Sequence, residues 1–139
     1  MQCMAVLDTN VIVSSLLSSK ADSATVQVFD LLFSDAFLPL ISKEILDEYR
    51  DVLHRPKFRF PADLIDDLLA AIEEKAELVA PATTGAIVPD LKDLPFYEVV
   101  LEKRADEAYL VTGNTKHFPK EPFIVTAREF LEILGQAQE

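Results

Sequence analysis

The fold is decided by the stretch Met4-Ala5-Val6-Leu7-Asp8-Thr9-Asn10, in which a short apolar run stops at an acid. The chain then continues as Val11-Ile12-Val13-Ser14-Ser15-Leu16-Leu17, so the whole stretch predicts a strand over 4–7, a turn and a helix over 9–17. In an open parallel sheet, ligands bind at the carboxyl ends of the strands, so Asp8 is placed where it could hold a metal ion. Its alternative role is to cap the helix that follows.

Predicted strands and helices alternate along the rest of the chain. Further strands are expected over residues 37–41, 77–80, 109–111 and 123–125. Helices are expected over about 23–33, 42–53 and 61–77, after Asp93, and from the capping box that begins at Thr126. Pro39 favours an edge position or an irregular start for its strand. The alternation predicts one domain over residues 1–139, an α/β fold with three layers (α/β/α) and a mainly parallel central sheet.

Composition limits the class of protein. Half of the 139 residues are hydrophobic, as in a globular domain, and no apolar run approaches the roughly 20 residues that span a bilayer. The chain starts without the pattern of a signal peptide, and its single cysteine cannot form an internal disulfide, so we expect a cytoplasmic protein without membrane contact. The net charge of −11 argues against a broad basic surface for nucleic acid and leaves room for a basic partner protein.

The residue types also exclude several chemistries. Three glycines cannot build a dinucleotide fingerprint or a phosphate loop, and two histidines with one distant cysteine give no zinc spacing. No serine lies in a G-x-S-x-G elbow. What remains is a surplus of carboxylates, which are the hard oxygen ligands that suit Mg²⁺ or Mn²⁺.

Three further segments could place an oxygen ligand near Asp8. Glu48 is the acid of its predicted helix that lies nearest to the apolar stripe, although a solvated helix charge is the alternative. Asp93 precedes a helix and could either face the mouth of the sheet or cap that helix, whereas Asp90 fits a turn. Asn114 ends the segment Thr112-Gly113-Asn114, which offers a hydroxyl and an amide oxygen or forms only a turn.

Together these segments resemble the PIN domain, a metal-dependent nuclease fold, over nearly the whole chain. The matching segments are Val6-Leu7-Asp8-Thr9-Asn10-Val11, Ile41-Ser42-Lys43-Glu44-Ile45-Leu46-Asp47-Glu48-Tyr49, Asp93-Leu94-Pro95-Phe96-Tyr97-Glu98-Val99 and Tyr109-Leu110-Val111-Thr112-Gly113-Asn114. The end of the chain, residues 124–131, is similar to one branch of the family, the VapC-like toxin components of bacterial toxin–antitoxin systems. The resemblance implies a ribonuclease that hydrolyses RNA phosphodiester bonds with Mg²⁺ or Mn²⁺.

The resemblance also implies a set of site residues. Asp8, Glu48 and Asp93 match the metal ligands, and Asn114 is the fourth catalytic position, where most relatives have aspartate. Asn10 and Thr112 match positions that support the site. The missing charge at Asn114 implies weaker binding of a second metal ion. The same likeness implies a basic antitoxin and a homodimer as partners.

Local basic patches would have to bring RNA to so acidic a chain. Arg55, Lys57 and Arg59 alternate with two aromatic side chains, and Lys116 begins a second patch, so these four are candidate RNA contacts. The alternative is that the first patch only complements a helix C-terminus. A different function also remains open: a catalytically weakened PIN-like module that binds RNA or protein, suggested by Asn114 and the acidic charge. A phosphatase of the aspartate type is disfavoured because position 10 is Asn.

Overall fold

The described part of the computed structural model, residues 3–82, 88 and 91–137, contains a sheet of five strands that pair only in parallel. The central strand is β1 (Met4–Leu7), which lies between β2 (Leu38–Ile41) and β4 (Tyr109–Val111). The edges are β3 (Glu77–Leu78) next to β2 and β5 (Ile124–Val125) next to β4. The predicted strands are therefore confirmed, with β3 shorter than expected.

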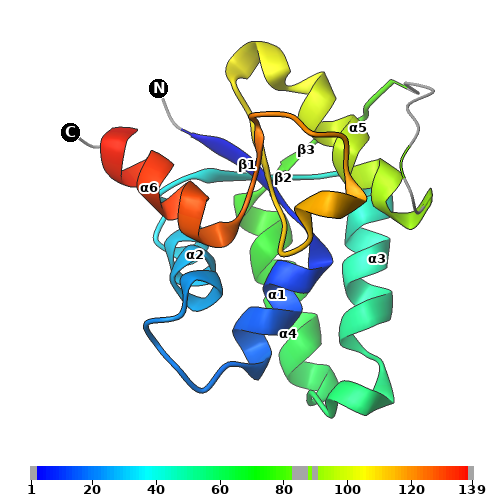
Figure 1. Ribbon diagram of the computed structural model, residues 1–139. Helices are drawn as coiled ribbons and strands as arrows, with labels where there is room; N and C mark the ends of the chain where they lie inside the picture. Colours follow the sequence, from blue (N-terminus) through cyan, green and yellow to red (C-terminus); the bar gives the residue numbers. More distant parts are fainter. Residues whose placement is uncertain (1–2, 83–87, 89–90, 138–139) are drawn as a thin grey trace.

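Helices cover both faces of this sheet, which confirms the predicted three-layer α/β/α fold. The helices are α1 (Thr9–Leu17), α2 (Ala24–Phe33), α3 (Lys43–Leu53), α4 (Ala62–Lys75), α5 (Leu94–Glu102) and α6 (Ala127–Ala137). Figure 1 shows α5 on one side of the sheet and α1, α2 and α4 on the other, with α6 beside α2. None of the helices in the described ranges is long and apolar enough to cross a membrane. The turn predicted at Asp90 lies outside the described residues.

Capping side chains near the first turn fix where several helices begin. The Ser42 hydroxyl accepts a hydrogen bond from the Ile45 backbone amide at 3.2 Å, and Ser23 caps α2 in the same way. Thr126 and Glu129 form the reciprocal capping box, with distances of 3.2 Å and 2.9 Å. Each cap satisfies backbone donors that the first turn of a helix leaves without a partner.

Pro39 does not lie in an edge strand, so the edge alternative was wrong; it is the second residue of β2. It pairs with Ala5 of β1 inside the sheet, and β3 flanks β2 on the other side. Leu38 donates its amide to the carbonyl of Cys3, directly before β1, so the alternation of a strand turns the nitrogen of Pro39 toward the β3 side. The pairing with β3 begins only at Leu40, so the missing N–H costs the sheet no ladder bond.

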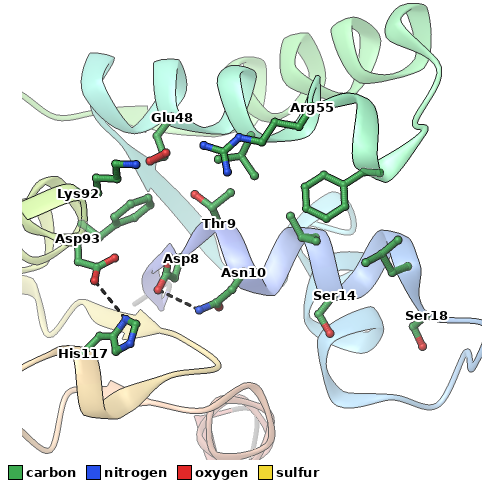
Figure 2. A pocket seen from close by; sticks show the side chains of 15 residues that line it. Asp8, Thr9, Asn10, Ser14, Ser18, Glu48, Arg55, Lys92, Asp93 and His117 are labelled. Carbon is green, nitrogen blue, oxygen red and sulfur yellow. Dashed lines mark hydrogen bonds and ion pairs between the residues drawn. The ribbon is translucent and has the colours of Figure 1, made fainter. Parts of the chain in front are cut away.

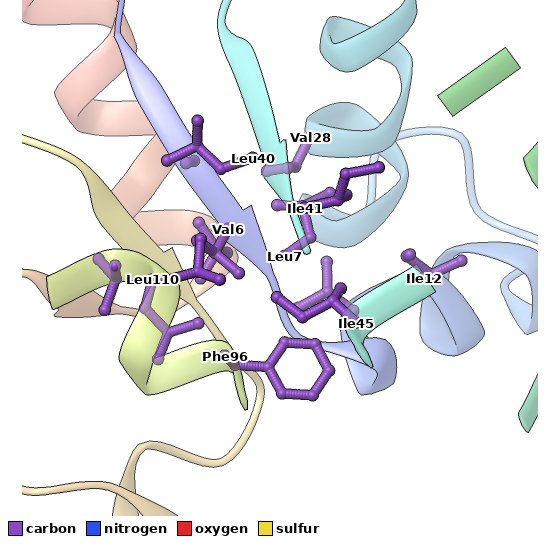
Figure 3. Close-up of a cluster of buried hydrophobic side chains, with 14 of the residues drawn as sticks. Val6, Leu7, Ile12, Val28, Leu40, Ile41, Ile45, Phe96 and Leu110 are labelled. Atoms are coloured by element: carbon purple, nitrogen blue, oxygen red, sulfur yellow. The ribbon is translucent and has the colours of Figure 1, made fainter. Parts of the chain in front are cut away.

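The core lies on both faces of β1. Ala5, Val6 and Leu7 are at most 2% exposed, which explains why this strand is a continuous apolar run and not an alternating one. Figure 3 shows side chains from β2, β4, α1, α3 and α5 packed around it, Ile12, Ile45 and Phe96 among them. This packing holds the carboxyl end of β1 in a fixed position.

The order β3-β2-β1-β4-β5 places a topological switch point between β1 and β4. The chain leaves β1 toward β2 and β3 on one side, and it leaves β4 toward β5 on the other side. In open α/β sheets a crevice forms outside the carboxyl ends of two such strands, and ligands bind there. Asp8 follows β1 and Thr112 follows β4, so both flank this crevice.

Candidate active site

Asp8 is held at the switch point by side chains and is not used as a helix cap. It occupies the N-cap position of α1, but its carboxylate makes no side-chain capping bond. One carboxylate oxygen, Oδ2, accepts hydrogen bonds from the Thr112 hydroxyl at 2.8 Å and from the Asn10 amide at 3.3 Å. The side chain is only 6% exposed. The carboxylate is therefore buried and firmly oriented toward β4.

Burial changes the acidity of Asp8. Desolvation raises its pKa from 3.8 to about 6, because the charged form loses its contact with water. The hydrogen bond from Thr112 opposes this rise, and the nearby charge of Asp93 adds to it. A cation in the crevice would offset both the lost hydration and the repulsion between the two carboxylates.

Asn10 and Thr112 form a polar bridge between the start of α1 and the end of β4. The Asn10 amide also lies 3.4 Å from the Thr112 hydroxyl, and Asn10 accepts a hydrogen bond from the Gly113 backbone at 3.0 Å. The Thr112 hydroxyl in turn accepts from the Asn114 backbone amide at 3.0 Å. The structure thus brings both predicted supporting residues into contact with Asp8.

A single pocket of about 720 Å³ brings together three of the predicted acids. Asp8, Glu48 and Asp93 come from β1, α3 and the start of α5, and Figure 2 shows them around the same space. Lys92 and Arg55 project into the pocket from the side of α5 and α3. Lys92 was not among the predicted site residues. Its position next to Asp93 is the only sequence feature that indicates a place in the pocket.

Glu48 faces the pocket as the helical pattern predicted. It is half-buried, whereas Glu44, Asp47 and Asp51 on the same helix are exposed. Burial raises the pKa of Glu48, and the positive charge of Arg55 opposes this shift. Its carboxylate stands across the pocket from Asp8 in Figure 2.

Asp93 contacts His117, the residue directly after Lys116. It occupies the N-cap position of α5 without a side-chain capping bond, and its Oδ2 lies 3.3 Å from Nδ1 of His117. The other ring nitrogen of His117, Nε2, lies 2.9 Å from the Asn114 amide nitrogen. Because an amide nitrogen can only donate, Nε2 accepts, and Nδ1 is left to carry the proton that faces Asp93.

Asn114 itself is not among the residues that line the pocket with Asp8, Glu48 and Asp93. Its amide contacts His117, and His117 lines the pocket in its place. The spacing of three residues between Asn114 and His117, within one 3₁₀ turn, is the only sequence signal for this contact.

The donor set fits a divalent ion with a hydrated shell. Among the described residues, no three His, Cys, Asp or Glu side chains gather into a ready-made metal cluster. Mg²⁺ does not require one, since it usually keeps several waters and binds through one or two carboxylates. The charge of Asp93 raises the pKa of both Asp8 and Glu48, so all three carboxylates influence one another through Asp93, and Glu48 could reach such an ion through water.

The candidate RNA contacts divide into two groups. Arg55 lines the pocket and forms an ion pair with Asp51 at 3.1 Å, whereas Lys57 and Arg59 are exposed beyond it. Lys116 is also exposed and borders a different cavity, which lies beside β5. Only Arg55 of these four is therefore adjacent to the acids.

The chain thus has a carboxylate-lined crevice at the switch point of a parallel α/β sheet. The sequence matches the PIN domain family over residues 4–116, and the chain belongs to this family. It is similar in fold to a chain in the crystal structure of VapBC2 from Rickettsia felis bound to a DNA fragment from their promoter. The TM-score is 0.53 at 19% identity, with 88% of this chain and 96% of that chain covered. A comparison with curated proteins found no match.

Proposed function

We propose that this protein is a Mg²⁺- or Mn²⁺-dependent endoribonuclease that hydrolyses RNA phosphodiester bonds. One observation carries the proposal: Asp8, a buried carboxylate at the switch point of a PIN-family sheet, shares its pocket with Asp93 and Glu48. A buried acid with a raised pKa in a cleft is a candidate functional group on physical grounds. Nothing in the pocket demands a covalent nucleophile.

The proposed roles of the acids follow from their surroundings. Asp8 and Asp93 would hold the ion, and Glu48 would contact it through water. When bound, a divalent ion neutralises charge that builds on the scissile phosphate and lowers the pKa of a coordinated water. Thr112 and Asn10 fix the direction of the Asp8 carboxylate by hydrogen bonds.

The remaining pocket residues would orient and attract the substrate. His117 holds Asp93 on the inner wall, and Asn114 acts on the site through His117 and not as a direct ligand. Arg55 and Lys92 carry positive charge at the α3 and α5 sides of the pocket, where they would draw RNA phosphates toward the acids. Lys57, Arg59 and Lys116 would contact the flanking RNA outside the pocket.

The biological role that we propose is that of the toxin in a toxin–antitoxin pair. The solved structure with the similar fold is a VapBC2 complex, which supports a protein partner for this chain. A basic antitoxin would complement the net charge of −11. We further propose one domain over residues 1–139, a homodimer and a cytoplasmic location.

Two observations favour a second function, a PIN-like module that binds RNA or protein and cleaves weakly. The fourth catalytic position is Asn114, and its amide is engaged by His117 outside the pocket. The described acids also form no cluster of three. Both features reduce the negative charge that would hold a second metal ion.

Cleavage of a labelled structured RNA separates the two functions. Metal-free protein is assayed with added Mg²⁺ or Mn²⁺, and wild type is compared with Asp8→Ala, Asp93→Ala and the exposed control Asp67→Asn. Metal-dependent cleavage that the first two substitutions abolish and the control retains supports the nuclease. Cleavage that survives both substitutions contradicts the proposed site. Metal and RNA binding without cleavage would favour the binding module.

A further inference from the structure

Tyr49 is a buried side chain beside the candidate active site, and the proposed roles leave it unused. It follows Glu48 on α3, is only 2% exposed and belongs to the core, and it is not among the residues that line the pocket. Its hydroxyl donates a hydrogen bond of 2.5 Å to the carbonyl of Leu7, the residue directly before Asp8. One hydrogen bond thus joins the chain neighbours of two predicted acids.

The register of the sheet explains why this carbonyl accepts from a side chain. In the parallel pairing of β1 with β2, Leu7 lies level with Ile41, the last residue of β2. Every second residue of β2 donates to β1, beginning with Leu38, so the ladder donor that would reach Leu7 is Ser42. Ser42 is instead the N-cap of α3. The Tyr49 hydroxyl, about two turns further along that helix, continues the attachment of this segment to β1.

Asp8 is held from the other side, by groups that do not belong to α3. Its backbone amide donates to the Val111 carbonyl of β4 at 2.9 Å. Its carboxylate accepts hydrogen bonds from side chains of α1 and of the residue that follows β4. The bond from Tyr49 therefore sets where α3, and Glu48 on it, lies relative to an acid that is already fixed.

The ring of Tyr49 contacts the element that carries the third acid. It packs against Phe96, with ring centroids 6.2 Å apart and ring planes at 41°. Phe96 lies in the first turn of α5, three residues after Asp93, and lines the pocket. Burial raises the pKa of Tyr49, and the charge of Asp8 raises it further, so the hydroxyl keeps the proton that it donates. One side chain therefore connects the three elements that carry Asp8, Glu48 and Asp93.

We propose that Tyr49 is a positioning residue that fixes Glu48 at the distance from Asp8 and Asp93 at which all three can act on one divalent ion. The inference rests on the proposed metal site and identifies the contact that sets the width of that site. Mg²⁺ requires near-ideal coordination geometry, so a small shift of α3 would weaken binding. Groups that orient the ligands of a metal typically contribute about 10–100-fold to its affinity.

Mn²⁺ binding by metal-free protein, measured by titration calorimetry without RNA, tests this role. Tyr49→Phe keeps the ring and removes the donor, and should weaken Mn²⁺ binding about tenfold, at the lower end of the range for such groups. Ser42→Ala weakens the start of the same helix within α3 alone, and should stay within about twofold of wild type. Tyr109→Phe makes the same chemical change on β4 outside the pocket, and should also stay within about twofold. Circular dichroism at the titration temperature confirms that each variant is folded.

A Glu48→Ala background distinguishes positioning of Glu48 from a general effect on the pocket. Glu48→Ala alone should weaken Mn²⁺ binding. Adding Tyr49→Phe should then change the affinity by less than about twofold, because α3 has no acid left to position. A further loss as large as in wild type would show that the hydroxyl acts elsewhere, and would overturn the proposal. Unchanged affinity in Glu48→Ala alone would overturn it as well.

The remaining outcomes separate this inference from the proposed function. If folded Tyr49→Phe binds Mn²⁺ as tightly as a wild type that does bind it, the role of Tyr49 is overturned and the metal site stands. The same follows if Ser42→Ala weakens binding as much as Tyr49→Phe, since any loosening of α3 would then suffice. If wild type binds no Mn²⁺ at millimolar concentration, both proposals are overturned. A wild type that shows the expected binding pattern but cleaves no RNA supports the role of Tyr49 and overturns the nuclease.

Discussion

The charge of Asp8 should control the stability of the metal-free protein. Burial raises the pKa of Asp8 from 3.8 to about 6 in the folded chain. The charge of Asp93 also raises this pKa, whereas the hydrogen bond from Thr112 lowers it. Between these two values the folded protein binds more protons than the unfolded chain, so the free energy of unfolding falls as pH rises. The stabilising contribution of Asp8 to the free energy of unfolding is fully present below pH 3.8, the pKa in the unfolded chain. It is lost as the pH rises through about 6, the pKa in the folded chain. The loss amounts to about 3 kcal/mol.

Asp8→Asn removes this penalty while it keeps the hydrogen bonds. Thr112 and Asn10 both donate to the same carboxylate oxygen, so the amide oxygen of asparagine can accept both. We therefore expect the variant to be more stable than wild type by about 3 kcal/mol near pH 7.5 and by roughly half as much near pH 5. Urea denaturation with a chelator present measures both values above the sequence pI of about 4.5.

The matched control is Asp67→Asn on the exposed face of α4, which should change stability by less than about 0.5 kcal/mol at either pH. An Asp8→Asn variant that is no more stable than wild type near neutral pH would refute the reasoning. A constant advantage that does not shrink toward acid pH would refute it equally. Saturating Mg²⁺ or Mn²⁺ should cancel most of this advantage, because an ion at about 100 times its dissociation constant stabilises wild type alone by about 2.7 kcal/mol.

Three further substitutions test the frame around the site by urea denaturation. Tyr49→Phe removes a buried hydroxyl that donates to the Leu7 carbonyl directly before Asp8, and should cost about 1–2 kcal/mol; no loss would show that this bond contributes nothing. Ser42→Ala removes the cap of α3 and should cost about 1 kcal/mol, a value that Ser42→Gly should largely recover. Gly113→Ala should change stability by less than about 1 kcal/mol, because its Cβ would meet Asn10 at an ordinary 3.4 Å and its φ is not positive; a larger loss would contradict this account.

The sequence determined those features that depend on neighbouring residues. The helix caps at Ser23, Ser42 and Thr126, the apolar stripe that turns Glu48 inward, and the buried strand before Asp8 are all local patterns, and the structure confirms them. Alternation of strands and helices was enough to predict the three-layer fold, since parallel strands need helical crossovers.

Other features depend on the strand order, which the local pattern does not contain. The missing N–H of Pro39 left an edge position or an irregular strand start open, but the edge strand is β3, whose pairing with β2 begins one residue later, at Leu40. Only the order of the sheet places β4 beside β1 and so brings Thr112 to Asp8, 104 positions away. The same packing decides that Asn114 contacts His117, and that His117 contacts Asp93.

The difference has a simple physical origin. Caps and helical faces arise from interactions within a few residues, so their chemistry is visible in the sequence. The raised pKa of Asp8 arises from desolvation by groups distant in the chain. The sequence by itself therefore determined which residues are chemically able to build the site, and the tertiary structure decided which of them face one another away from water.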